Sequence, residues 1–154
     1  MIKNKLIFIL LLPFICFANE NAYDALFVKY SKIHKIPSQL LWAIAKTESN
    51  FNPSAINKAN DNGTYDIGLM QVNSIHEENL KKLGLTLNDL YDPEINVRYA
   101  SAYLAKCFKK WGFNYKGLNC YNGRISNNNY NIKVLNKLRK KQKIVYKNTN
   151  AIIK

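Results

Sequence analysis

The segment from Asp92 to Gly112 constrains the fold most, because it carries clear signals for both ends of one long helix. Asp92 is a capping acid, Pro93 suits the first helical position, and Glu94 places a carboxylate near the positive helix end. Gly112 ends the pattern. Between these ends, helical spacing predicts one buried stripe of apolar and small residues: Val97, Ala100, Ser101, Leu104, Cys107, Phe108 and Trp111.

Shorter helical patterns flank this segment. They cover residues 22–35, 39–49 (with Ser38 as N-cap), 68–83, 115–121 and 130–138. Between them, the polar stretch 57–66 contains Asp61-Asn62-Gly63, a turn signal that can join two short strands. The sequence therefore predicts a mostly helical α+β fold with one small β-hairpin inserted before the third helix.

The first residues have the pattern of an export signal. Lys3 and Lys5 precede an apolar run over 6–17, which is too short to span a bilayer, and small residues favour cleavage after Ala18. The alternative is a lipoprotein signal with Cys16 lipidated, which the bulky Ile15 disfavours. We expect residues 1–18 to be a signal peptide and the mature protein to be exported, to the periplasm or beyond.

The mature chain is strongly basic. Removing residues 1–18 takes away Lys3 and Lys5, which leaves 21 basic against ten acidic side chains, a formal charge of +11. Such a charge favours a polyanionic partner, and export favours the cell wall or a membrane over nucleic acid. Eight Lys and Arg residues and no acid fall in 133–154, so we assign 141–154 to a basic C-terminal tail.

Cys107 and Cys120 are the two cysteines of the mature chain. In an oxidising compartment they predict a disulfide, with two buried free thiols as the alternative. Their spacing fits no zinc pattern. The only histidines, His34 and His76, stand alone in the sequence and are expected at the surface. We therefore expect no metal and no cofactor, and carboxylate chemistry is the main enzymatic option.

Glu48 is the first candidate for that chemistry. On its predicted helix it shares a face with Leu41, Ile44 and Ala45. Burial raises the pKa of a glutamate above its reference of about 4.3, so that it can donate a proton near neutral pH. Taken alone the pattern is weak, because a glutamate near a helix end is more often solvated.

Three sequence blocks in order strengthen the assignment. They are ESNFNP at 48–53, DIGLMQVN at 66–73 and YNG at 121–123. Together they resemble the soluble lytic transglycosylases of the goose-lysozyme-like superfamily, and most closely the small members that accompany secretion, conjugation and invasion machines. The resemblance covers roughly residues 22–138. It implies a lysozyme-like transglycosylase domain over 19–140.

The resemblance also implies roles for individual residues. Glu48 matches the catalytic glutamate, which cleaves the bond between N-acetylmuramic acid (MurNAc) and N-acetylglucosamine (GlcNAc) with formation of a 1,6-anhydro end. The positions matched to substrate binding are Ser49, Met70, Gln71, Tyr121 and Asn122. Met70 could equally be core filler, and Ser49 could serve only to orient Glu48. The chain departs from the family pattern at Cys120, usually alanine, and at Arg124, usually a small residue.

Asp66 keeps a hydrolytic muramidase in consideration, because many glycosidases use two carboxylates. Its alternative is a structural carboxylate that caps the turn or helix ahead of Gly68. A non-catalytic glycan-binding scaffold is the third hypothesis, and a basic factor for membranes or nucleic acid is the fourth. We expect a monomer that acts on peptidoglycan glycan strands, in the service of a secretion machine or similar envelope assembly, and that does not bind nucleic acid.

Overall fold

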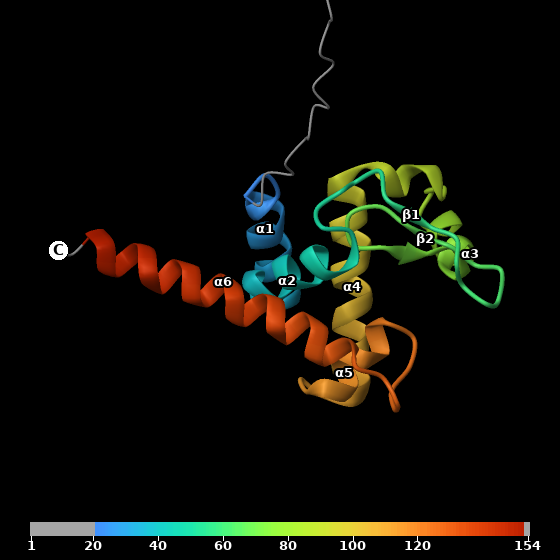
Figure 1. Cartoon of the computed structure of the whole chain (residues 1–154). Helices are drawn as coiled ribbons and strands as arrows, with labels where there is room; N and C mark the ends of the chain where they lie inside the picture. Colours follow the sequence, from blue (N-terminus) through green and yellow to red (C-terminus); the bar gives the residue numbers. More distant parts are fainter. Residues whose placement is uncertain (1–20, 153–154) are drawn as a thin grey trace, which may run out of the picture.

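Helix α4 (Pro93–Trp111) runs through the middle of the molecule. The computed structural model describes residues 21–152, so the predicted signal peptide and Cys16 lie outside the described residues. The Asp92 side chain accepts a hydrogen bond from the Ile95 backbone N–H at 2.9 Å, and Gly112 ends the helix with a φ of 83°. Both ends predicted for this helix, at Asp92 and at Gly112, are thus confirmed. In Figure 1, α1 and α2 lie on one side of α4, and the strands and α3 lie on the other.

The remaining elements are short except for the last. The other α-helices are α1 (Asp24–His34), α2 (Ser38–Glu48), α3 (Glu77–Lys81), α5 (Tyr115–Tyr121) and α6 (Tyr130–Ile152). The strands are β1 (Ile56–Asn57), β2 (Asp66–Ile67) and β3 (Val72–Asn73), and two 3-10 turns are η1 (Ser74–His76) and η2 (Asn88–Tyr91). Helix α2 begins one residue earlier than predicted, with Pro37 rather than Ser38 at its N-cap. Among residues 21–152, no helix combines the length and apolar character needed to cross a membrane.

The core forms where α1, α2 and α6 pack together and where α1 packs on α4. Leu41 and Ile44 of α2, together with Val97 and Leu104 of α4, are fully buried. Burying a side chain of this size contributes roughly 1.5–3 kcal/mol. Because α2 is enclosed on most of its surface, its C-terminal residue, Glu48, is held in a fixed position.

The β region differs from the prediction. The three strands form an antiparallel sheet in the order β1-β2-β3, with Asp66 paired to Asn57 on one side and to Asn73 on the other. The predicted helix over 68–83 is wrong: Gly68 turns the chain with a φ of +79°, β3 follows, and only 77–81 are α-helical. The Asn73 side chain accepts from the Ile75 N–H, which starts η1 instead of a longer α-helix.

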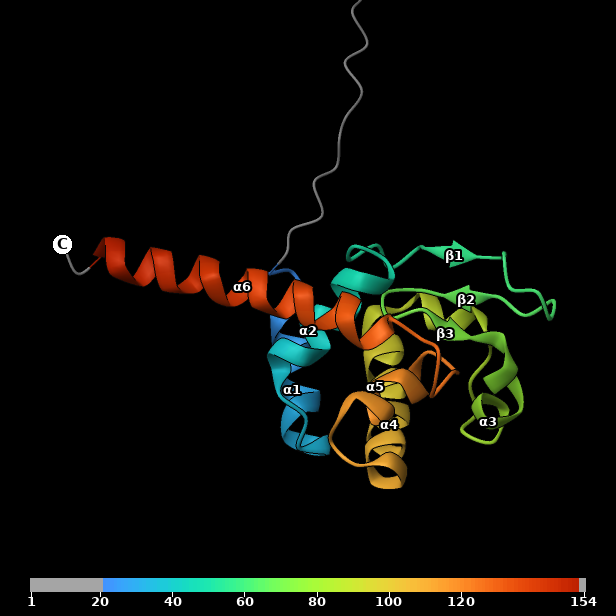
Figure 2. The same cartoon turned by 60° about the horizontal axis from the view of Figure 1, so that its bottom comes forward.

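Helix α6 continues past its predicted end near residue 138 and reaches Ile152. No proline or glycine follows position 138 to stop it. Its first half packs on α2: Val134 is fully buried, and the Lys141 ammonium lies 4.3 Å from the ring centroid of Trp42. Figures 1 and 2 both show the second half extending away from the other helices.

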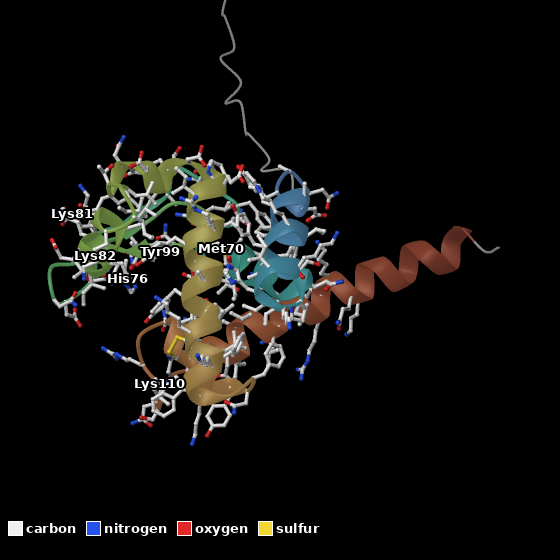
Figure 3. All side chains as sticks on the ribbon, turned by 180° about the vertical axis from the view of Figure 1, so that it is seen from behind. Met70, His76, Lys81, Lys82, Tyr99 and Lys110 are labelled. Atoms are coloured by element: carbon white, nitrogen blue, oxygen red, sulfur yellow. A yellow bond between two sulfur atoms is a disulfide. The ribbon has the colours of Figure 1, made fainter. Side chains whose placement is uncertain are left out.

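Cys107 of α4 and Cys120 of α5 are joined by a disulfide, with their Cα atoms 5.7 Å apart. The sulfur–sulfur bond is visible in Figure 3, at the lower part of α4. The bond holds α5 against α4, and Tyr121, the last residue of α5, follows Cys120 directly.

Candidate active site

Glu48 is the last residue of α2 and lines a cleft of about 750 Å³. The β region contributes Asp66, Gln71 and Asn73 to the lining, and α4 and α5 contribute tyrosines. Glu48 itself is partly buried, because the apolar face of α2 draws the end of the helix into the core. The Glu48 carboxyl group therefore lies at the boundary between the cleft and the protein core.

The turn after Glu48 is tightly defined. Asn50 and Phe51 both have left-handed backbones, with φ values of 53° and 65°, which is rare for a bulky residue such as Phe. The Phe51 ring is buried and offsets this strain by packing against Trp42, with the ring centroids 5.2 Å apart. The Ser49 hydroxyl donates to the Leu69 carbonyl at 2.7 Å. Ser49 is therefore placed as a brace between two segments, outside the lining of the cleft.

Tyr130, the first residue of α6, contacts the candidate acid directly. Its hydroxyl donates a hydrogen bond to Glu48 Oε1 at 2.5 Å, across 82 positions of sequence. This bond leaves the other carboxyl oxygen, Oε2, available to donate or accept a proton. Sequence reasoning placed Tyr130 on the last helix but gave it no role at the site.

The protonation of Glu48 is set by opposing effects. Burial is the largest and raises its pKa from 4.5 to about 7, and the charge of Asp66 acts in the same direction. The hydrogen bond from Tyr130 and the charge of Lys133 oppose it, because both stabilise the carboxylate. A group with a pKa of about 7 is present in both forms at neutral pH, as a residue that first donates and then accepts a proton requires.

Tyr121 and Asn122 line the cleft together with Glu48. The Tyr121 hydroxyl donates to the Met70 carbonyl at 2.7 Å, and its ring lies 6.2 Å from that of Tyr130. Burial raises the pKa of Tyr121 well above 10, so its hydroxyl stays protonated. The Asn122 side-chain oxygen accepts from Asn128 at 3.2 Å.

Gln71 and Met70 occupy different environments. Gln71 lines the cleft, and its side-chain amide donates to the carbonyls of Gly68 and Ala55 at 2.8 and 3.2 Å. Met70 is fully buried, so its side chain belongs to the core and does not line the cleft as the resemblance implied. Its backbone carbonyl instead anchors Tyr121. Figure 3 shows Met70 beside α4, on the inner side of the molecule.

A buried asparagine attaches this loop to α4. The Asn96 side chain donates to the carbonyls of Ile67 and Leu90, and its oxygen accepts from the Met70 N–H, all at 2.8–2.9 Å. Asn96 is fully buried, and both its amide group and its oxygen bond directly to backbone groups. A buried amide satisfied in this way fixes the loop more rigidly than apolar packing alone.

Asp66 lies on β2 and also lines the cleft. Its carboxylate accepts from three asparagine side chains: Asn73 at 2.6 Å, Asn60 at 3.1 Å and Asn57 at 3.2 Å. It caps no helix, but its bond to Asn60 holds the turn between β1 and β2, so its surroundings agree with the turn role expected for it. Asp66 ties the three strands and the β1–β2 loop together while facing the same space as Glu48.

Known proteins share both the sequence and the fold of this chain. Residues 25–144 match the transglycosylase SLT domain family, which is more than half of the chain. The chain belongs to the SLT transglycosylase family. It is 37% identical over 108 residues to the invasion protein IagB of Salmonella typhi, covering 70% of this chain and 67% of that protein. It is 35% identical over 124 residues to protein IpgF of Shigella flexneri, covering 80% and 78%.

A solved structure supports the same placement. The 70-kDa soluble lytic transglycosylase of Escherichia coli is 25% identical and superposes with a TM-score of 0.57, covering 77% of this chain. This chain spans about 21% of the length of that protein. The lysozyme-like fold expected from the sequence blocks is thereby confirmed.

The SLT domain also contains an aromatic wall that sequence reasoning missed. His76 lies between Tyr99 and Tyr103, with ring centroids 5.6 and 4.6 Å away, and all three line the cleft. His76 is partly buried rather than a plain surface residue, and burial, followed by the charge of Lys106, lowers its pKa. The only sequence signal was the spacing of Tyr99 and Tyr103 at i and i+4, which puts them on one face of a helix.

Among residues 21–152, which the structure describes, no group of three or more His, Cys, Asp or Glu side chains is arranged to hold a metal ion. The charged and polar groups of the cleft are mostly carboxylates, amides and phenols, together with the Thr64 hydroxyl, the His76 imidazole and the Arg124 guanidinium. Such a set suits hydrogen bonding to sugar hydroxyls and proton transfer from a single acid.

Proposed function

We propose that this protein is an exported lytic transglycosylase that cleaves the β-1,4 bond between MurNAc and GlcNAc in peptidoglycan. The observation that carries the proposal is Glu48, which lines the cleft with a pKa of about 7 and with one oxygen held by Tyr130. The family and the fold support the type of reaction, and Glu48 is a suitable acid for it.

The reaction uses Glu48 twice. Protonated Glu48 donates its proton from Oε2 to the glycosidic oxygen, and the bond from that oxygen to MurNAc C1 breaks. The resulting carboxylate accepts the proton of the MurNAc C6 hydroxyl as O6 bonds to C1. Glu48 is thereby reprotonated, the chain ends in a 1,6-anhydro sugar, and no water is consumed. As the glycosidic bond breaks, the oxygen of the substrate's own N-acetyl group bonds to C1, and this temporary bond breaks when O6 attacks C1.

The other site residues hold substrate and acid in place. Gln71, Tyr121 and Asn122 line the cleft and are proposed to bind the glycan strand. Ser49 and Met70 are proposed to act indirectly, by holding other residues of the site in place. Ser49 braces the turn that follows Glu48, and the Met70 carbonyl accepts the Tyr121 hydroxyl.

Hydrolysis is the second candidate, because Asp66 shares the cleft with Glu48 and its charge acts on the pKa of that residue. A hydrolase would use Asp66 as its second carboxylate and would release reducing ends. The three asparagine amides around Asp66 favour a structural role instead.

Mass spectrometry of muropeptides released from purified peptidoglycan distinguishes the two reactions. We expect anhydro ends from the wild type, and the same ends at a modestly lower rate from Asp66→Asn. Reducing ends from the wild type that disappear in Asp66→Asn would establish the hydrolase.

The cellular setting forms part of the proposal. IagB bears the name of an invasion protein, and a small SLT domain suits local opening of the wall. We propose that the mature protein acts in the periplasm, as a monomer, for a secretion machine or similar envelope assembly. Fractionation of cells expressing the full-length chain tests this, since activity confined to the cytoplasm would contradict it.

A further inference from the structure

The end of α4 and the start of α5 together expose aromatic rings and lysines on one short segment. Over residues 109–116 the sequence is KKWGFNYK. Phe113 is 63% exposed, Tyr115 is 55% exposed, and Trp111 is half-buried. We name residues 109–116 the aromatic tip. Figure 3 shows one of its lysines, Lys110, at the lower end of α4.

The aromatic tip is well ordered although its rings face solvent. The Asn114 side chain donates to the Trp111 carbonyl at 3.0 Å and accepts from the Lys116 N–H at 2.8 Å. The Phe113 ring contacts the Phe108 ring, with the centroids 4.6 Å apart. This contact covers only part of Phe113, so the rest of the ring is a preformed apolar surface for a ligand.

The lysines of the aromatic tip face no opposing charge. Lys109, Lys110 and Lys116 are exposed, and none of them forms an ion pair with any residue that the structure describes. The Lys110 ammonium lies 5.3 Å from the ring centroid of Trp111. Residues 95–154 contain 14 Lys and Arg and no acid, so the sequence around the tip has the same sign of charge. The tip therefore attracts an anionic surface.

The chemistry of the aromatic tip matches the surface of a phospholipid bilayer. Trp and Tyr combine an apolar ring with a polar atom and concentrate where headgroups meet acyl chains, and lysines reach the phosphates there. Trp111 and Tyr115 flank Phe113, whose ring has no polar atom and suits the acyl boundary. A glycan strand or a peptide instead needs hydrogen-bonding side chains, and the one amide of the tip, Asn114, is already bonded to the backbone. A membrane is therefore the favoured ligand.

The aromatic tip is separate from the catalytic cleft. Residues 109–116 do not belong to the lining of that cleft. Helix α5 begins at the tip with Tyr115 and ends at the cleft with Tyr121, which corresponds to about 9 Å along its axis. Binding at the tip thus uses none of the groups that face a glycan strand.

We propose that the aromatic tip binds the anionic surface of a phospholipid membrane, with Phe113 inserted among the lipids and the lysines on their phosphates. The ligand is a bilayer that contains an anionic lipid such as phosphatidylglycerol. This inference goes beyond the proposed function, because it adds a second binding surface that would hold the enzyme on a membrane beside the wall.

Flotation of the mature protein with lipid vesicles tests the proposal. We expect binding to vesicles of phosphatidylglycerol with phosphatidylcholine, and much weaker binding to phosphatidylcholine alone. Lys110→Gln with Lys116→Gln should weaken binding to the anionic vesicles by roughly ten- to thirtyfold. The matched control, Lys58→Gln with Lys82→Gln, removes the same charge from exposed lysines outside the tip and should have a smaller effect. Figure 3 shows Lys82 well away from Lys110.

A second pair of variants tests insertion of the exposed ring. Phe113→Ser should weaken binding to the anionic vesicles by roughly five- to tenfold, because its apolar surface leaves water on binding. Leu83→Ser is the control, since Leu83 is 64% exposed and lies outside the tip. Both variants are first checked for folding by circular dichroism.

Tryptophan fluorescence gives an independent measurement. The chain has two tryptophans, and Trp42 is only 5% exposed, so a change on binding reports on Trp111 of the aromatic tip. Anionic vesicles should shift the emission to shorter wavelength as this ring leaves water.

Three results would overturn the proposal: no binding to anionic vesicles, equal losses in the tip variants and their controls, or binding without a fluorescence shift. Tip variants that bind vesicles normally but lose binding to purified peptidoglycan would assign the tip to the wall instead. The vesicle measurements contain no glycan, so their failure would leave the proposed reaction untouched, and failure of the reaction would leave them valid.

Discussion

At Glu48, burial and a single hydrogen bond act on the same carboxyl in opposite directions. Burial favours the protonated form and raises the pKa to about 7, whereas the Tyr130 hydroxyl favours the carboxylate. The bond also holds the carboxyl group in one orientation. Tyr130 is therefore a positioning residue, and its effect should be visible in the pH dependence of the reaction.

Tyr130→Phe removes the hydroxyl and keeps the buried ring. The carboxylate loses a stabilising donor, so the pKa of Glu48 should rise further above its ordinary value. The limb of the pH–kcat/KM profile on which the acid is lost should move to higher pH by the same amount, with a lower maximum rate. Tyr115→Phe, at an exposed position, is the control. An alkaline limb that stays in place would show that Tyr130 does not act on Glu48.

Among the elements, the loop over 68–71 connects most parts of the site. It is attached to α4 through Asn96, to α5 through Tyr121 and to the turn after α2 through Ser49. Gly68 makes this possible, because a Cβ there would lie 2.3 Å from the Leu90 carbonyl oxygen and 2.4 Å from Asn96 Nδ2.

Gly68→Ala should consequently lower the free energy of unfolding by more than about 3 kcal/mol, since backbone strain and a clash with fixed atoms combine. Gly84→Ala is the matched control: its φ is +70°, but no atom lies within 4 Å of the added Cβ. It should cost about 1 kcal/mol. Urea denaturation of both variants measures the difference. Similar losses would mean that strain alone, without the clash, explains Gly68.

The bridge between α4 and α5 gives a prediction for the mature protein. Denatured, unreduced chains should show no free thiol and a monomeric mass, because Cys107 and Cys120 are joined. Loss of the bond should cost slightly less than the roughly 3 kcal/mol expected for a 15-residue loop. It should also loosen Tyr121 and slow cleavage. Two thiols per chain would exclude the bond.

Across the whole molecule, local signals predicted local structure well. The Asp92 and Gly112 signals gave both ends of α4, and the core-facing pattern of α2 predicted a desolvated Glu48. Contacts between segments that are distant in the sequence could not be predicted from such local signals. The bond from Tyr130 to Glu48 spans 82 positions, and the three bonds of Asn96 join segments that only the folded chain brings together.

The two errors in the predicted helices have different origins. The segment that starts at Gly68 has an apolar pattern compatible with a helix, but the Gly68 N–H donates to the Ala55 carbonyl and the Met70 N–H donates to the Asn96 side chain instead. The basic composition after residue 138 predicts a tail, but nothing in that sequence stops a helix, and α6 continues to Ile152.

The rate at which Glu48→Gln releases 1,6-anhydro muropeptides from purified peptidoglycan tests the central claim most directly. Glutamine has nearly the same shape but can neither donate nor accept the proton in transfer. We predict that the wild type releases anhydro ends and that Glu48→Gln, folded as judged by circular dichroism, is slower by at least roughly 10²–10⁴-fold. A folded Glu48→Gln protein that retained most of the wild-type rate would contradict the assignment of Glu48 as the catalytic acid and base.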